Sequence, residues 1–472
     1  MRVAIRHMNQ RFRTRVGFAG FLRGAVLGLI ACAGGGALLN VAYAQDGTGE
    51  QQTLTADALE ARQAALLQVM LENPADLDTA FDYAAIAAQN GDFEAAISTY
   101  ERMLIYAPGL ARVQLELGVL YYRLGSFETA RNYFFSALSA PNVPPEVQQR
   151  VETYLAAIDQ QDRRAQFRAT VVAGARYQTN ANAAPGSRRV DLNGGTFILD
   201  ETSTGRADYN GFLAGNAYAS YDLGAQGDLL EADLIFYGAR YADISRLDTG
   251  LAEFTVGPSL NMKRFRFDNG RLGIYGIFSG IRLNHANYSG ALGAGTRLAY
   301  AFDPLTLFDG KLEYRRRWYN DTAEYPTVSD RNGYQIKTAI TVTRQLSGSF
   351  TARTLLLADF EETEKAWTQS WEVGVGFGGT YQFASPIEAL PNRWSIDVEA
   401  GYIYRSYDGP DPLIDPTESQ TDNEGWMRAV LAVPLRNDVT LGLTGELRRQ
   451  QSNYDLATYN NASAMVTIAK SF

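Results

Sequence analysis

The feature that most constrains this chain is a change in hydrophobic period near residue 160. Before that point apolar residues recur every three or four positions, and after it they alternate with polar residues or glycine. Segment 394–405 shows the alternation most clearly, because every even position from 394 to 404 is apolar. Alternation sets one face of a sheet against apolar surroundings and the other against water, whereas the longer period indicates amphipathic helices. The sequence therefore predicts a helical domain followed by a β-domain.

The alternating pattern occurs fourteen times between residue 168 and the C-terminus. An even number of antiparallel strands returns both ends of the sheet to one side, as in barrels of the bacterial outer membrane. Three long polar connections, 178–208, 320–331 and 408–423, all follow odd-numbered segments. This parity fits an outer-membrane barrel, in which long loops lie outside the cell and short turns lie in the periplasm. We therefore expect residues 161–472 to form a 14-stranded antiparallel outer-membrane β-barrel.

Charged side chains on the polar face of these strands should line the lumen. Because both signs occur, the lumen has no evident preference for one small ion. It could be a hydrated conduit or be closed by internal ion pairs, and the sequence leaves both open. The expected lumen-lining residues are Glu231, Asp233, Arg315, Arg317, Lys337, Arg353, Asp397, Glu399 and Arg405.

Aromatic residues gather near the ends of the predicted strands. Trp318, Trp394, Tyr404 and Trp426 are examples. In membrane barrels such rings form girdles at the two membrane–water interfaces, where one edge of the ring is apolar and the other is wet. We expect these four residues to belong to such girdles.

Residues 55–160 contain an internal repeat with a 34-residue period, in which Gly91 and Phe93 recur as Gly125 and Phe127. The period and helical pattern are those of tetratricopeptide repeats, helix–turn–helix units that stack because one unit cannot bury its own apolar face. The inner helices of such repeats line a groove suited to an extended peptide. The residues expected in this groove are Phe81, Gln89, Arg112, Leu115, Tyr122 and Arg123.

The first 44 residues contain six Arg, no Lys and no acidic residue, and they include an apolar run over 25–39. This is the layout of a secretory signal peptide, with cleavage predicted after Ala44. Residues 29–32 also resemble a lipobox, which would make Cys32 a lipidation site. Residues 45–54 are expected to be a linker that leads into a periplasmic repeat domain.

Removal of the signal peptide leaves one histidine, His285, and no cysteine, and changes the net charge from −9 to −15. A His/Cys metal cluster and a Cys–His nucleophile pair are then excluded by count. An acidic exported chain is also a poor nucleic-acid ligand, because phosphate binding needs clustered Lys and Arg. No run of 18 apolar residues follows the signal, so no helical membrane span is expected. We expect no enzyme activity, no cofactor and no metal.

A signal peptide, a short tetratricopeptide domain and a 14-stranded C-terminal barrel together resemble the surface lipoprotein assembly modulator (Slam) family. Segment 174–185 is similar to the Asn-x-Asn-x-Ala-Pro segment of that family, with Asn180, Asn182, Ala184 and Pro185 at the matching positions. The resemblance implies a Gram-negative protein-transport factor. Its periplasmic repeats would engage a client lipoprotein or secreted binding protein, and its barrel would help the client cross the outer membrane.

Two other interpretations of the same layout stay open. Exopolysaccharide exporters also join tetratricopeptide repeats to an outer-membrane barrel, and a general porin could carry the repeats as a protein scaffold. The expected partners are the client, outer-membrane lipid and the barrel assembly machinery. The last of these follows because the chain ends in an alternating strand closed by Phe472, which resembles the signal that this machinery reads.

Overall fold

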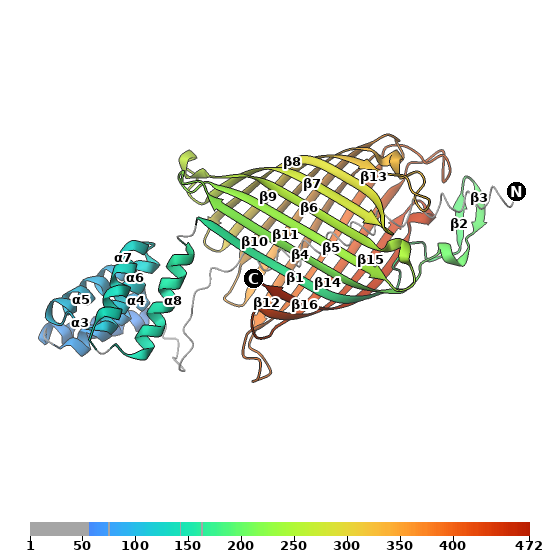
Figure 1. The fold of residues 1–472 in the computed structure, drawn as a ribbon. Coiled ribbons are helices and arrows are strands. Elements are labelled where there is room, and N and C mark those ends of the chain that lie inside the picture. The colour runs from blue at the N-terminus through green and yellow to red at the C-terminus, as the bar shows by residue number, and fades with distance from the viewer. Residues whose placement is uncertain (1–55, 74–75, 142, 162–163) are drawn as a thin grey trace. The chain divides into compact units, whose positions relative to one another are not determined.

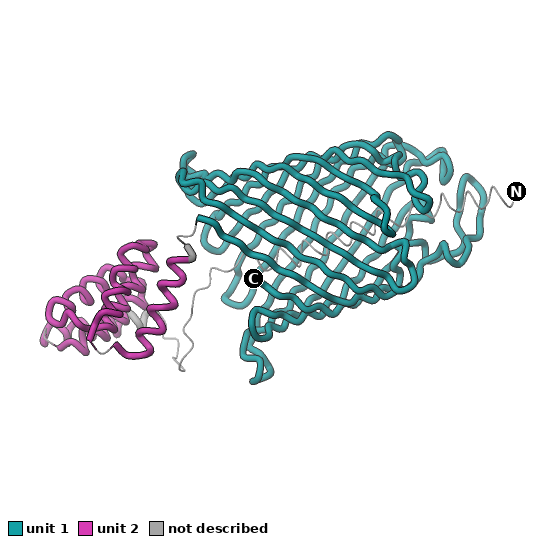
Figure 2. Tube along the Cα trace, viewed as in Figure 1, with its two compact units in different colours: residues 1–41, 164–472 teal, residues 42–163 magenta. Residues whose placement is uncertain are grey.

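The computed structural model describes residues 56–73, 76–141, 143–161 and 164–472 (Figure 1). The predicted signal peptide, the linker and Cys32 lie outside the described residues. The described chain forms two compact units, a helical one within residues 42–163 and a β-unit over 164–472 (Figure 2). None of the described helices is long and apolar enough to cross a membrane.

The helical unit has six helices within the described residues, as expected for stacked tetratricopeptide repeats. They are α3 (Ala56–Glu72), α4 (Leu77–Asn90), α5 (Phe93–Tyr106), α6 (Ala111–Arg123), α7 (Phe127–Ser139) and α8 (Pro145–Gln161). Gly91 and Gly125 hold the turn between the two helices of successive repeats with φ of +84° and +75°. A left-handed residue ends a helix at low cost only when it lacks a side chain, which explains the 34-residue recurrence of glycine.

Close packing explains a further repeat glycine. A Cβ added to Gly118 on α6 would lie 2.4 Å from the ring of Phe134 on α7. Phe134 is fully buried, in a cluster that includes Val151 of α8. The neighbouring cluster is built around Tyr100 of α5 and helices α3, α4 and α6. The repeat unit therefore buries its apolar side chains in two neighbouring clusters, both of which contact Tyr121, as expected for stacked repeats.

Fourteen antiparallel strands close the β-unit into a barrel, and each strand pairs with its neighbours in sequence except where β1 meets β16. Figure 1 shows the strands tilted around the barrel. The barrel strands are β1 (Ala165–Gln178), β4 (Asp208–Asp222), β5 (Leu229–Tyr241), β6 (Thr249–Asn261), β7 (Gly270–Leu283), β8 (Ala286–Asp303), β9 (Thr306–Tyr319), β10 (Gly333–Gln345), β11 (Phe350–Thr363), β12 (Ser370–Phe383), β13 (Trp394–Tyr407), β14 (Thr421–Pro434), β15 (Val439–Ser452) and β16 (Tyr459–Ser471). The predicted fold class and strand number are confirmed.

The first long connection is more ordered than its polar sequence suggested. It contains a short hairpin, β2 (Arg189–Leu192) and β3 (Gly195–Ile198). Val190 and Leu192 lie on its buried side and pack against Ile414 and Tyr454 from two other loops. A two-stranded hairpin is marginal by itself, so its stability depends on these contacts between distant loops.

Side chains alternate across the barrel wall as expected. On β9, Leu312, Tyr314 and Trp318 point outward and are about half exposed, whereas the intervening Glu313 and Arg315 are half-buried or buried on the inner face. An apolar outer face and a polar inner face are the arrangement of a membrane-spanning barrel, since lipid surrounds it and water enters it.

The girdle prediction is wrong for Trp426. A Cβ added to Gly401 on β13 would lie 2.7 Å from the Trp426 ring, and Gly401 shares the inner face with Arg405. The ring therefore faces the lumen and fills the space left by Gly401 and by Gly376 on β12. Alternation along the strand assigns Trp426 to the inner face correctly, because Glu424 lies two residues away. The girdle prediction failed because it relied on the aromatic side chain alone.

All connections that follow odd-numbered barrel strands lie at one end of the barrel, called the loop end here. The three longest of these connections are 179–207, 320–332 and 408–420. The opposite end is called the turn end. Strand β1 begins at the turn end, where Ala165 pairs with Tyr221 beside the short turn that follows β4.

Candidate functional sites in the repeat groove and the barrel lumen

Two predicted groove residues of the repeat unit lie against each other. The Arg112 guanidinium of α6 sits 4.9 Å from the centre of the Phe81 ring of α4. Phe81 is half-buried and also contacts Tyr100 of α5, with ring centres 5.4 Å apart. Arg112 itself is exposed. An aromatic ring with a cation over its face is a surface that can take an apolar or aromatic side chain from an extended peptide.

The other predicted groove residues divide into exposed and packed ones. Gln89 and Arg123 are exposed near the ends of α4 and α6. Tyr122 is half-buried and packs edge-on against Tyr154 of α8. The groove prediction is wrong for Leu115, which is 1% exposed in the cluster with Val151 of α8. Helix α8 covers it, and the sequence repeat could not show that a further helix packs there.

The repeat unit is strongly acidic. Residues 56–161 contain six Arg, no Lys and fourteen acidic residues, a net charge of −8. The only basic groups on the predicted groove are Arg112 and Arg123. A surface with this charge balance attracts cationic ligands and repels acidic ones, and the effect weakens as salt screens it.

Ion pairs between non-adjacent strands show which face of the barrel is the lumen. Arg315 on β9 reaches Glu253 on β6, three strands away, at 2.5 Å, and also pairs with Glu313 at 2.6 Å. Side chains converge on the concave face of a barrel and diverge on its convex face, so such a long reach is possible only inside. Arg317 likewise spans two strands to Glu361 on β11 at 3.1 Å.

Small residues make room for these bridges. Arg353 on β11 reaches Asp397 on β13 at 2.8 Å, and Thr380 on the intervening β12 donates a hydrogen bond to the same carboxylate. Gly378 lies on β12 between the two strands, opposite both Arg353 and Glu399. A side chain at Gly378 would press on Glu399, since an added Cβ would lie 3.1 Å from its Cγ. The glycine on the polar face thus serves as a gap for crossing side chains.

A denser cluster surrounds Arg405. Its guanidinium pairs with Glu372 at 2.8 Å and with Asp422 at 3.3 Å, and Arg405 is 3% exposed. Glu424, beside Asp422, pairs with both Arg405 and Arg448. A buried guanidinium is tolerated because its donors find several carboxylates, which offsets part of the desolvation cost.

The remaining predicted lumen residues also lie on the inner face. Glu399 pairs with Arg428 at 2.6 Å, and Glu231 accepts a hydrogen bond from Tyr218 at 2.8 Å. Lys337 lies opposite Glu313 on β9, and Asp233 lies opposite Tyr218 on β4. The bridges therefore run along the wall between strands up to three apart.

Several partners in these pairs were not predicted. They alternate onto the same inner face as the predicted residues, so the alternation along each strand could have identified them. They are Glu253, Arg297, Asp309, Asp359, Glu361, Glu372, Asp422, Glu424 and Arg428.

The asparagines of segment 174–185 brace the first long loop, and the Asn180 side chain also donates to the carbonyl of Asn460 on β16 at 3.2 Å. The Asn180 side chain donates to the carbonyl of Ala184 at 2.8 Å and accepts from its N–H at 3.2 Å. Asn182 donates to the carbonyl of Thr204 at 2.9 Å and accepts from the N–H of Arg206 at 2.8 Å. Both are buried, at 5% and 3% exposure, so the segment holds the two ends of this loop together at the loop end.

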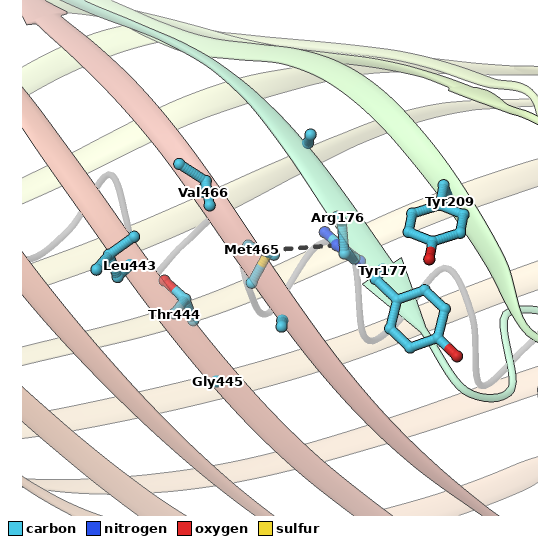
Figure 3. Close-up of a pocket in the computed structure, with 10 residues that line it drawn as sticks. Arg176, Tyr177, Tyr209, Leu443, Thr444, Gly445, Met465 and Val466 are labelled. Carbon is cyan, nitrogen blue, oxygen red and sulfur yellow. Dashed lines mark hydrogen bonds between the residues drawn. The ribbon is translucent and has the colours of Figure 1, made fainter.

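A shallow groove of about 500 Å³ lies on the outer face where β1 closes on β16 (Figure 3). Tyr177, Tyr209, Leu443 and Val466 line it together with smaller residues such as Ala175, Gly445 and Ala464. These side chains belong to the apolar exterior that faces lipid, so the groove is separate from the lumen.

These features define a class: a tetratricopeptide-repeat unit joined in one chain to a closed, polar-lined β-barrel whose exterior supports an outer-membrane location. Residues 87–149 match the family model described as tetratricopeptide repeat. A search of curated protein sequences finds no match to this chain.

Solved structures align with the chain at low identity. A bacterial polysaccharide outer membrane secretin is 10% identical with a TM-score of 0.35, covering 65% of this chain and 98% of its own. An outer membrane channel from Pseudomonas putida F1 is 12% identical with a TM-score of 0.34, covering 64% and 95%. The type III secretion chaperone SycD of Yersinia enterocolitica, in complex with a peptide of the translocator YopD, is 17% identical with a TM-score of 0.22, covering 23% and 85%.

Proposed function

We propose that this protein is an outer-membrane translocon of the surface lipoprotein assembly modulator kind. Its repeats capture a client lipoprotein or secreted binding protein in the periplasm, and its barrel delivers the client across the outer membrane. The observation that carries the proposal is the pairing, in one chain, of the Phe81–Arg112 surface with a lumen whose charged groups reach water. Arg353 and Asp397 keep about a fifth of their side-chain surface exposed inside the barrel.

The order of the two units along the chain supports these roles of capture by the repeats and delivery by the barrel. The repeats end with α8, and β1 begins at the turn end only a few residues later. In outer-membrane barrels short turns face the periplasm, so the chain enters the barrel from the compartment where a client would arrive.

The charge of the repeat unit indicates the kind of segment that it binds. With a net charge of −8 and an aromatic ring on its inner surface, the unit favours an extended client segment that carries basic and apolar side chains. Salt should weaken this capture, because exposed charges are screened within about 10 Å at 0.1 M ionic strength.

We further propose that the chain moves its client without chemical conversion. His285 lies in the two-residue turn between β7 and β8, where Asn284 and His285 both have positive φ. Such left-handed pairs form the tight turns of β-hairpins, which is a sufficient reason for this residue pair at that place.

The test is surface display. Deleting this protein should abolish protease sensitivity at the cell surface of a lipoprotein encoded nearby. Phe81→Ala should reduce display and client binding several-fold while the helical unit stays folded. The matched control is Phe135→Ala, which truncates an exposed ring on α7. Unchanged display in the deletion strain would reject the proposal.

Polymer secretion is measured in the same strains. Loss of polymer with normal lipoprotein display would favour an exopolysaccharide exporter. The mixed signs of the lumen charges do not favour that alternative, since a lumen rich in aromatic rings and one charge sign would suit a sugar polymer better.

A further inference from the structure

The lumen is accessible near the turn end and filled at the loop end. Near the turn end the side chains of Arg353 and Asp397, each three residues from the start of its strand, are 21% and 22% exposed. Near the loop end Tyr241, Leu283 and Asp422 are at most 7% exposed, although they also belong to inner-face positions. Water therefore enters the lumen at the turn end but has little access to the wall at the loop end.

Three loops fold inward to produce this closure on one half of the barrel. They are 179–207, 242–248 and 320–332, and each contributes apolar side chains to one buried cluster with β4, β5, β7 and β8. We call their contribution the loop cap. It consists of Ala181, Ile244, Leu247, Tyr325 and Val328.

Segment 320–332 is the part of the loop cap that is braced within itself. The Asp321 carboxylate accepts hydrogen bonds from the N–H and the hydroxyl of Ser329, both at 2.9 Å. Thr322 and Tyr325 exchange two backbone hydrogen bonds at 3.1 Å. The segment can therefore keep its shape when it leaves the cluster.

Tyr325 is the anchor that docks this segment. Its side chain is 2% exposed, its ring packs edge-on against Tyr288 of β8 with centres 5.5 Å apart, and its hydroxyl donates to the Arg246 carbonyl at 3.1 Å. Burial raises the pKa of Tyr325 to about 12, so the phenol is neutral at physiological pH. A single ring thus joins segment 320–332 to a second loop and to the barrel wall.

On the other half of the loop end the inner wall is lined by buried ion pairs. Glu361, Arg405, Asp422 and Glu424 are at most 3% exposed, and their ion pairs join strands of the wall that are one or two apart, between β9 and β15. These groups are integral to the strands and cannot swing away. Within the loop cap, the docking of the 320–332 segment is therefore a contact that can release without breaking the wall.

We propose that the barrel is a gated conduit, closed at its loop end by the loop cap and opened when the 320–332 segment undocks Tyr325 from the cluster. This distinguishes the protein from a permanently open porin. The inference rests on the proposed function only in taking the lumen as the route, and it needs no knowledge of the client.

The test is ion conductance of the purified full-length protein in planar lipid bilayers. Wild type should be mostly closed. Tyr325→Ala should increase the open time several-fold, because the segment loses its ring contacts and its hydrogen bond to Arg246. Tyr325→Phe keeps the ring and should stay close to wild type. The matched control is Ala323→Ser, an exposed position on the same segment.

Folding of every variant is checked by heat-modifiable migration in SDS gels. If Tyr325→Ala does not fold, Val328→Ser, which disturbs the second buried side chain of the segment, replaces it. A folded variant that conducts no more than wild type would overturn the gate, and so would a wild type that is already steadily open. Conductance without any lipoprotein display would retain the gate and reject the translocon, so the two failures are distinguishable.

Discussion

The two units of this protein place the same kinds of side chain in opposite positions. The repeat unit buries Tyr100 and Phe134 and exposes its charges, whereas the barrel exposes Leu356 and Phe377 and encloses its arginines. In both units apolar side chains avoid water, but only the barrel has lipid outside. The comparison teaches that burial alone does not identify a core: what counts is which solvent lies on each side of the chain.

The difference also changes what holds each interior together. The repeat unit is stabilised by the apolar area that it removes from water and by tight contacts such as that between Gly118 and Phe134. The barrel interior depends on guanidinium–carboxylate clusters, where each charge needs its partners to offset desolvation. Substitutions that remove an apolar contact from the repeat unit or a paired charge from the barrel interior test this comparison.

The largest effect is expected for Phe134→Ala in the repeat unit. The ring is fully buried, so its removal should leave a cavity and cost about 3–5 kcal/mol. Circular dichroism at 222 nm on the full-length protein reports this melt, because the described helices longer than a few residues all lie in the repeat unit. Phe135→Ala, which removes a 51% exposed ring, is the control. Equal melting losses in both variants would contradict the assigned core.

The next effect is expected for Arg405→Met in the barrel. The variant leaves Glu372 and Asp422 facing each other without their cation, and breaking a buried pair in this way costs about 3–5 kcal/mol. The midpoint of urea unfolding in detergent, followed by gel migration, measures the loss. Arg449→Met on the exposed face of β15 is the control. A stable Arg405→Met protein would show that the lumen charges are well solvated.

A smaller loss is expected for Leu356→Arg on the outer face of β11. Leu356 is 47% exposed, and an arginine facing lipid near the bilayer midplane costs about 2–4 kcal/mol. The control is Thr341→Arg, on the inner face of the neighbouring strand β10, where water can solvate the new charge. Reversible folding into lipid vesicles gives both values. If Thr341→Arg were the more harmful change, the inner and outer faces would be wrongly assigned.

The smallest effect is expected for Asp76→Ala, which removes the cap of α4. The Asp76 carboxylate accepts hydrogen bonds from the Thr79 hydroxyl at 2.7 Å and from the Asp78 and Thr79 N–H groups. The Thr79 hydrogen bonds lower its pKa. Its stabilisation is therefore complete above the ordinary carboxyl range and is lost as the pH falls through the lowered pKa.

This predicts a slightly lower Tm for Asp76→Ala at neutral pH, recorded at 222 nm, and a difference from wild type that shrinks in acid. Asp82→Ala, on an exposed position of the same helix, serves as the control. A difference that grows in acid would contradict the assignment of the cap.

Most of the fold could be predicted because both units have local periodicity. The 34-residue repeat indicated the paired helices, and strict alternation gave the fourteen strands and the inner face of residues such as Arg315 and Arg405. The errors came where the answer lay in a distant part of the chain. Leu115 is covered by α8, and Trp426 fills the space left by Gly401 on the adjacent strand.

By itself the sequence determined where helices give way to strands, how many strands there are and which side chains share a face, because these depend on spacing along a short stretch of chain. Only the tertiary structure decided which carboxylate meets which guanidinium and that loops far apart in sequence close one end of the lumen. Closure of the barrel brings Arg315 to Glu253, and Tyr325 to the Arg246 carbonyl, across 62 and 79 residues. No local pattern encodes such pairings, because they depend on how many strands separate two positions around the ring.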